Sequence, residues 1–83
     1  MPTVAIVDGV AIRFYPDEHP PPHFHAVFAE FAAQIRIAPP KVLHGSLLPS
    51  KMKAVLSWAN ENREGLMDAW MALEAGHKPR KLS

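Results

Sequence analysis

The chain has 83 residues and a mass of 9.2 kDa. A chain of this length forms one small domain, because two domains would each be too small to bury a stable core. It contains no cysteine, which excludes disulfide bonds and thiolate metal ligands. The 48% hydrophobic content argues against disorder, and the net charge of +1 indicates neither a nucleic-acid nor a membrane partner.

No apolar run reaches the roughly 18 residues of a membrane span, and the N-terminus has no basic region before its short apolar stretch. We therefore expect a cytoplasmic protein with no membrane partner. Nine prolines and five histidines are the unusual feature of the composition. Four of these prolines and three of these histidines fall within residues 16–25, which marks this segment as a candidate site.

The first half of the chain has the pattern of antiparallel strands. Two β-branched runs within residues 3–15 flank Asp8 and Gly9, a pair that suits a two-residue hairpin turn. Residues 23–28 and 32–37 predict a second hairpin with its turn around Ala29 and Glu30, and residues 42–44 a short edge strand. Alternation in the first hairpin predicts that one face is buried, with Val4, Ile6, Val10, Ile12 and Phe14 on it.

The second half has the pattern of two helices. Pro49 suits a first helical turn, and apolar residues recur at helical spacing after it. A second helix is expected from near Asn62 to a C-terminal cap at Gly76. The fold predicted is α+β, with a small antiparallel sheet of two hairpins followed by two C-terminal helices packed on one face. Residues 1–76 form the single domain, and residues 77–83 a flexible basic tail.

His23 and His25 carry the chemistry of the segment rich in proline and histidine. Two residues apart on a strand, they point to one face while Phe24 points to the other. Two imidazoles on one face can bind a divalent transition metal such as zinc, nickel or iron, given a third ligand, so the segment predicts a binding module for such a metal or for an anionic group. His19 is the nearest candidate for that ligand, and Glu18, Asp17 and His44 are reserves.

Two other interpretations of the histidines remain open. His23 and His25 could act as general acid and base in cleaving RNA or another phosphoester, with Arg13 binding the phosphate and Arg36 or Lys41 nearby. They could also be purely structural, donating hydrogen bonds to loop carbonyls.

Two further features bear on partners. The second helix is apolar on more than one side, which predicts either a wide stripe facing the core or a surface that contacts a small partner protein or a second copy of the chain. The tail carries three cations and no acid, so a small DNA-binding regulator is a further alternative; these cations are Lys78, Arg80 and Lys81.

Residues 14–26, F-Y-P-D-E-H-P-P-P-H-F-H-A, resemble the signature of a family of short bacterial proteins known only as a domain of unknown function. The recurrent pattern of that family, acid-acid-H-x-P-P-H-x-H, matches this chain from Asp17 to His25. The opening M-P-T, the segment 45–49 and the tryptophans of both helices extend the likeness over nearly the whole chain. The resemblance implies a second small protein encoded nearby, in an arrangement of the toxin–antitoxin type.

Overall fold

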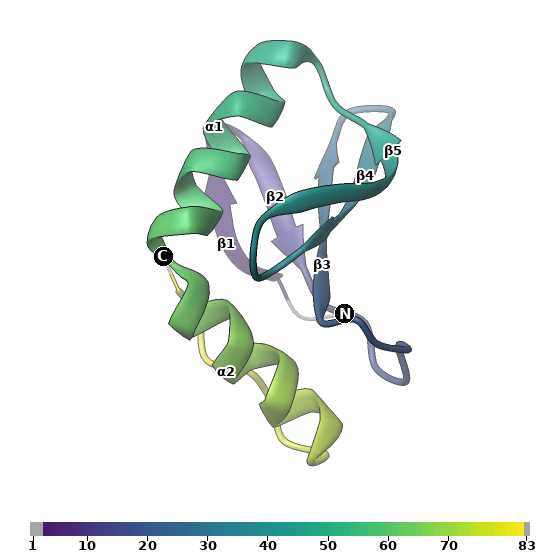
Figure 1. The fold of residues 1–83 in the computed structure, drawn as a ribbon, viewed down its shortest axis with the longest axis vertical. Helices are drawn as coiled ribbons and strands as arrows, with labels where there is room; N and C mark the ends of the chain where they lie inside the picture. The colour runs from purple at the N-terminus through teal and green to yellow at the C-terminus, as the bar shows by residue number, and fades with distance from the viewer. Residues whose placement is uncertain (1–2, 83) are drawn as a thin grey trace.

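The computed structural model describes residues 3–82 and has an α+β architecture (Figure 1). Five antiparallel strands precede two helices, and each strand pairs with its neighbour in the sequence. The elements are β1 (Thr3–Val7), β2 (Val10–Arg13), β3 (His23–Phe28), β4 (Phe31–Arg36), β5 (Lys41–Ser46), α1 (Pro49–Glu61) and α2 (Arg63–Glu74). The prediction of an antiparallel sheet followed by two helices is confirmed.

The turn between β1 and β2 decides which side chains of the first hairpin are buried. Asp8 and Gly9 both have positive φ angles, 50° and 82°, so the turn contains only these two residues and sets the register. In that register Ala5 lies opposite Ile12, and both are buried. Ile6 therefore points to the other face and is 59% exposed, so the prediction of a buried Ile6 is wrong.

The edge strand β5 is longer than the expected residues 42–44 and requires a glycine. Gly45 has a φ of 76°, and a Cβ atom there would lie 2.2 Å from the backbone oxygen of Ala32 on β4. No side chain fits at that position. The close approach of the two backbones lets β5 pair along β4 up to Ser46, opposite Ala32.

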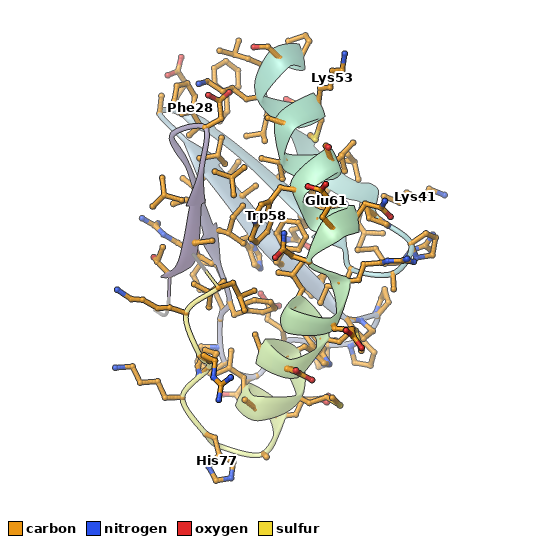
Figure 2. The ribbon with its side chains drawn as sticks, turned by 90° about the vertical axis from the view of Figure 1, so that its left-hand side faces the viewer. Phe28, Lys41, Lys53, Trp58, Glu61 and His77 are labelled. Atoms are coloured by element: carbon orange, nitrogen blue, oxygen red, sulfur yellow. The ribbon has the colours of Figure 1, made fainter. Side chains whose placement is uncertain are left out.

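Both helices are amphipathic and share the junction residue Asn62. On α1, Val55 is buried, whereas Lys53 and Glu61 are exposed at the surface (Figure 2). The backbone N–H of Asn62 donates to Ala59 at 3.2 Å and its side-chain amide donates to the Trp58 carbonyl at 2.8 Å. Asn62 thus satisfies carbonyls at the end of α1, and α2 starts at the next residue, as predicted.

Helix α2 ends in a Schellman motif. Gly76 has a φ of 80° and donates its N–H to the Leu73 carbonyl, and His77 donates to Ala72. The expected glycine cap is therefore confirmed. Glycine suits this position because the left-handed conformation is strained for residues with a Cβ atom.

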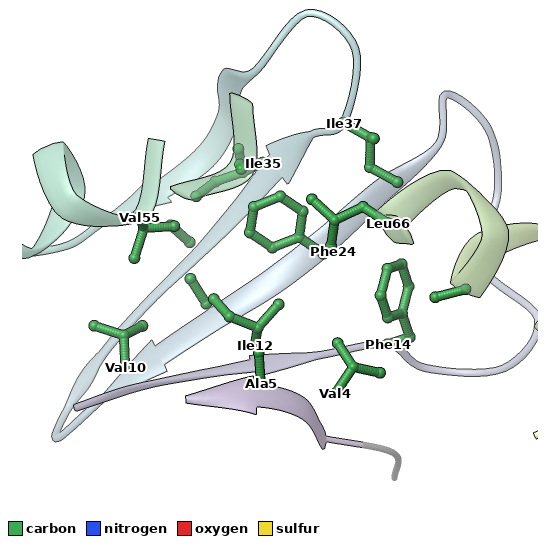
Figure 3. Packing of buried hydrophobic residues seen from close by; sticks show 14 of the residues in the cluster. Val4, Ala5, Val10, Ile12, Phe14, Phe24, Ile35, Ile37, Val55 and Leu66 are labelled. Atoms are coloured by element: carbon green, nitrogen blue, oxygen red, sulfur yellow. The ribbon is translucent and has the colours of Figure 1, made fainter. Parts of the chain in front are cut away.

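The hydrophobic core lies where the sheet and the two helices meet (Figure 3). Alternate strand residues point into it, Ile12 from β2, Phe24 from β3 and Ile35 from β4, together with Val55 of α1 and Leu66 of α2. The intervening residues point to the opposite side of the sheet. We call that side the outer face and define it by one row of paired residues, Arg13, His25, Gln34 and His44.

The segment after Gly76 returns to the sheet. The N–H of Leu82 donates to the backbone oxygen of Val4 on β1 at 2.7 Å, and Pro79 is buried. A Cβ atom at Gly65 on α2 would approach the Leu82 side chain to 2.9 Å. The segment predicted to be a flexible tail thus contacts β1 and α2 as far as residue 82, and Met1, Pro2 and Ser83 lie outside the described residues.

Within residues 3–82, neither helix has the length and hydrophobicity needed to cross a membrane.

Gly45 and Gly76 have similar positive φ angles, so alanine substitutions at the two positions separate the cost of backbone strain from the cost of steric overlap. We expect Gly76→Ala to lower the free energy of unfolding by about 1 kcal/mol, because only its φ is unfavourable and nothing lies within 4 Å of the added carbon. Gly45→Ala adds overlap with the Ala32 backbone and should lower it by roughly 3 kcal/mol or more. Urea unfolding checks both values, and equal losses would contradict the packing of β5 on β4.

Candidate functional site

The connector between β2 and β3, residues 14–22, brings Glu18 over the first residues of β3. Glu18 Oε1 lies 2.6 Å from Nε2 of His25, and Glu18 Oε2 lies 3.8 Å from Nε2 of His23. The two imidazole ring centroids are 5.3 Å apart. One ligand atom from each of these residues lies within 4.8 Å of the other two, so we call Glu18, His23 and His25 the histidine–glutamate cluster.

The strand alternation places the two histidines in this position. Phe24 is fully buried in the core and anchors this part of β3 to the helices. His25, one residue later, has the opposite direction and keeps 17% of its side chain exposed. His23, at the start of the strand, is covered by the connector and α2, with 6% of its side chain exposed.

A hydrogen bond on the far side of the ring fixes the tautomer of His23. Its Nδ1 lies 2.8 Å from the backbone oxygen of Pro21, and a carbonyl oxygen can only accept, so Nδ1 carries the proton. In the neutral ring Nε2 then holds a lone pair aimed at the cluster. This Nε2 is buried and has no hydrogen-bond partner among residues 3–82. An unpaired buried nitrogen beside a carboxylate oxygen is unfavourable unless a proton on that nitrogen or a metal ion lies between them.

His25 differs from His23 because its Nε2 has a hydrogen-bond partner. Its Nε2 donates a hydrogen bond to Glu18 Oε1 at 2.6 Å, a short distance typical of a charged acceptor. The ring packs edge-on against Tyr15 with the centroids 4.3 Å apart, which restricts its rotation. A metal ion with bonds of about 2.0–2.2 Å spaces its ligand atoms roughly 3.3 Å apart. Replacing the shared proton by a metal therefore needs small side-chain movements and a change of tautomer in which Nδ1 of His25 takes up a proton as Nε2 releases one.

The other candidate ligands lie elsewhere. His19 and Asp17 are exposed on the connector and are not part of the histidine–glutamate cluster. His44 is exposed on β5 and is separated from His25 by Gln34 of β4. Arg13, which the sequence predicts to bind a phosphate group, lies on β2 directly opposite His25 of β3, on the outer face.

Trp70 is a residue of the site that the sequence did not indicate. Its ring lies 5.2 Å from that of His23, measured between centroids, and the residue is 5% exposed. Helical spacing correctly indicates a buried Trp70. The contact with His23 depends on where α2 crosses the sheet, and no local pattern in the chain encodes that crossing.

Two imidazoles and one carboxylate are the donor set of many zinc and iron sites. The hydrogen bond from His23 to a backbone carbonyl is the usual support for a metal-binding histidine, because it orients the ring and leaves the other nitrogen free. Three protein ligands also leave at least one coordination position open. The residues present therefore fit a divalent transition metal ion.

A comparison with models of protein families shows which family the chain belongs to. The family model of a domain of unknown function, DUF4160, matches residues 9–71. The chain belongs to that family. The matched region contains the connector, the whole histidine–glutamate cluster and Trp70. No curated protein and no solved structure matches this DUF4160 chain.

The tautomer of His23 can be measured directly. At about pH 8 without added metal, long-range proton–nitrogen correlation spectra should show His23 protonated at Nδ1, because Pro21 accepts from that atom. The exposed His44 is the internal reference, since within residues 3–82 it forms no side-chain hydrogen bond that would impose this tautomer. Protonation of His23 at Nε2 would contradict the geometry described here.

Proposed function

We propose that this DUF4160 chain binds a divalent transition metal ion through Glu18, His23 and His25. The observation that carries the proposal is the buried Nε2 of His23, which lacks a hydrogen-bond partner among residues 3–82 and faces a carboxylate oxygen at 3.8 Å. A lone pair and a carboxylate facing each other at this distance attract a shared cation. A metal ion satisfies both groups at once and takes His25 as its third ligand.

Burial supports a site of defined geometry. Pro21 holds the ring of His23 from behind, and Tyr15 holds the ring of His25 from the side. Rings that are already oriented lose little conformational entropy when they bind an ion. Since Glu18 belongs to the connector, a bound ion would also tie the connector to β3.

Partial exposure supports a site that can take a further ligand. Glu18 and His25 keep 29% and 17% of their side chains exposed. A shallow groove of about 240 Å³ adjoins Glu18 and Trp70, and Asp17, Leu73 and Glu74 complete its lining. An ion held by three protein ligands beside an open groove resembles a catalytic or ligand-binding centre more than a closed structural one.

The same burial weighs against metal-free cleavage of RNA. A general acid or base must reach the reacting atoms, but His23 Nε2 has less than 1 Å² exposed to solvent. The roles of the chain in a toxin–antitoxin module, in binding a small partner protein and in binding DNA stay predictions made from the sequence.

Metal content tests the proposal. Untagged protein purified without chelator should carry close to one zinc, nickel or iron ion per chain by elemental mass spectrometry. His23→Ala and His25→Ala should lose it, while His44→Ala, an exposed histidine of the same sheet, should retain it. At 100 times the Kd a metal ion stabilises the protein by about 2.7 kcal/mol, which raises Tm by roughly 10–20 °C.

Glu18→Gln tests metal binding separately from folding, because Glu18 is partly exposed and glutamine has nearly the same shape as glutamate. It should weaken metal binding while the metal-free protein retains a Tm close to that of the wild type. Equal metal content in the wild type and all three cluster variants would contradict the proposal, as would a wild-type protein that neither contains nor takes up metal.

Trp70 provides an optical test of position. Ni²⁺ is an open-shell ion and quenches indole emission at short range, so Trp58→Phe, which retains Trp70 beside His23, should lose much of its fluorescence on Ni²⁺ binding. Trp70→Phe retains only Trp58 and should lose much less. Equal quenching of the two variants would place the ion away from the histidine–glutamate cluster.

A further inference from the structure

Charge is distributed unevenly between the sheet and the rest of the molecule. All eight Asp and Glu residues lie outside the five strands, in turns, the connector and the helices. The strands instead carry two arginines, one lysine and three histidines. The outer face therefore has no acidic side chain from any strand, and Glu18 is the carboxylate that the connector brings beside His25.

Two arginines flank the histidine–glutamate cluster from the neighbouring strands. Arg13 on β2 lies opposite His25, and Arg36 on β4 lies opposite His23. Directly paired residues of antiparallel strands have Cβ atoms about 5 Å apart on the same face. Each imidazole of the cluster thus has a guanidinium group as its cross-strand neighbour.

Both guanidinium groups are half-buried and uncompensated. Arg13 donates from Nε to the hydroxyl of Thr3 at 3.3 Å, and Arg36 donates from Nε to the Pro39 carbonyl at 3.2 Å. Neither forms an ion pair with a carboxylate within residues 3–82. Both acceptors are neutral, so these hydrogen bonds do not compensate the positive charges of the two arginines. The bonds use the Nε atoms, so the terminal amino groups remain as donors to a further acceptor.

We propose that the outer face binds a phosphate monoester, with one phosphate oxygen on the open coordination position of the metal and Arg13 and Arg36 donating to the others. The inference rests on the proposed metal site and names the ligand of that site. Guanidinium groups match the oxygens of phosphate in pairs, and a divalent ion attracts the same oxygens.

The charge of the site selects this class of ligand. A divalent ion with one carboxylate ligand and two arginine neighbours leaves a positive centre, which the exposed Asp17 and Glu74 along the groove beside Glu18 offset only in part. A phosphate monoester carries close to two negative charges at neutral pH, whereas a carboxylate or a phosphodiester carries one. The monoester also exposes three terminal oxygens, one for the metal ion and one for each arginine, whereas a carboxylate or a phosphodiester exposes two.

The experiment uses the full chain loaded with Co²⁺, whose visible absorption reports on its ligands. Inorganic phosphate should change this spectrum with saturation, at a concentration at least tenfold lower than acetate requires. Arg13→Gln and Arg36→Gln should each raise the half-saturating phosphate concentration by roughly tenfold, as expected for the loss of a charge-assisted hydrogen bond. Arg13→Lys keeps the charge, removes the paired donors and should give an intermediate value.

Lys53→Gln is the matched control, because it removes the same charge from an exposed position on α1 (Figure 2). It should change the half-saturating phosphate concentration by less than twofold. The Co²⁺ content and Tm of each variant are measured in parallel, so that a variant that loses metal or fold is recognised.

The outcomes distinguish the two proposals. A wild-type chain that binds no Co²⁺ would overturn the metal site and this inference together. A Co²⁺ protein whose spectrum phosphate leaves unchanged, or changes equally in the arginine variants and the wild type, would overturn the phosphate site alone. Tighter binding of an oligonucleotide without a terminal phosphate than of a nucleoside monophosphate would overturn the choice of a monoester.

Discussion

The hydrogen bond from His23 Nδ1 to the Pro21 carbonyl is the constraint on which the site depends. It joins the last part of the connector to the first residue of β3 and fixes both the direction and the tautomer of one ring. Without it, the ring could rotate or change tautomer and satisfy its own Nε2 elsewhere. With it, that buried nitrogen faces Glu18 and has no partner within the described part of the chain.

The antiparallel register extends this local constraint across the sheet. Phe24 is fully buried in the core, so His25 must lie on the outer face. The pairing of β2 with β3 then sets Arg13 beside His25. The same strand therefore contributes to the core with one face and to a polar, positively charged surface with the other.

The helices contribute to the site mainly by excluding water. Trp70 of α2 packs against the ring of His23, and the connector covers the rest of that ring. Removing water strengthens electrostatic interactions and makes an unpaired nitrogen more costly. Under the proposed function, packing of α2 on the sheet would thus affect how strongly the histidine–glutamate cluster attracts a cation, although α2 supplies none of its three side chains.

Local patterns along the chain were enough to predict the types of secondary structure and the segment that contains the candidate site. The Asp8-Gly9 turn, the change from strand to helical spacing near Pro49 and the cap at Gly76 depend on neighbouring residues only, so they could be predicted. The same holds for the opposite directions of Phe24 and His25, which follow from the geometry of any strand. The segment rich in proline and histidine contains both histidines and Glu18.

Which side chains meet depends on how the elements pack together. His19 and Glu18 are adjacent in sequence and equally suited to bind a metal, but the path of the connector turns Glu18 toward β3 and leaves His19 exposed. Ile6 is exposed because the turn sets the register, and periodicity alone leaves two registers open. The contact of Trp70 with His23 joins residues 47 positions apart, and such contacts depend on how whole elements pack rather than on local preference.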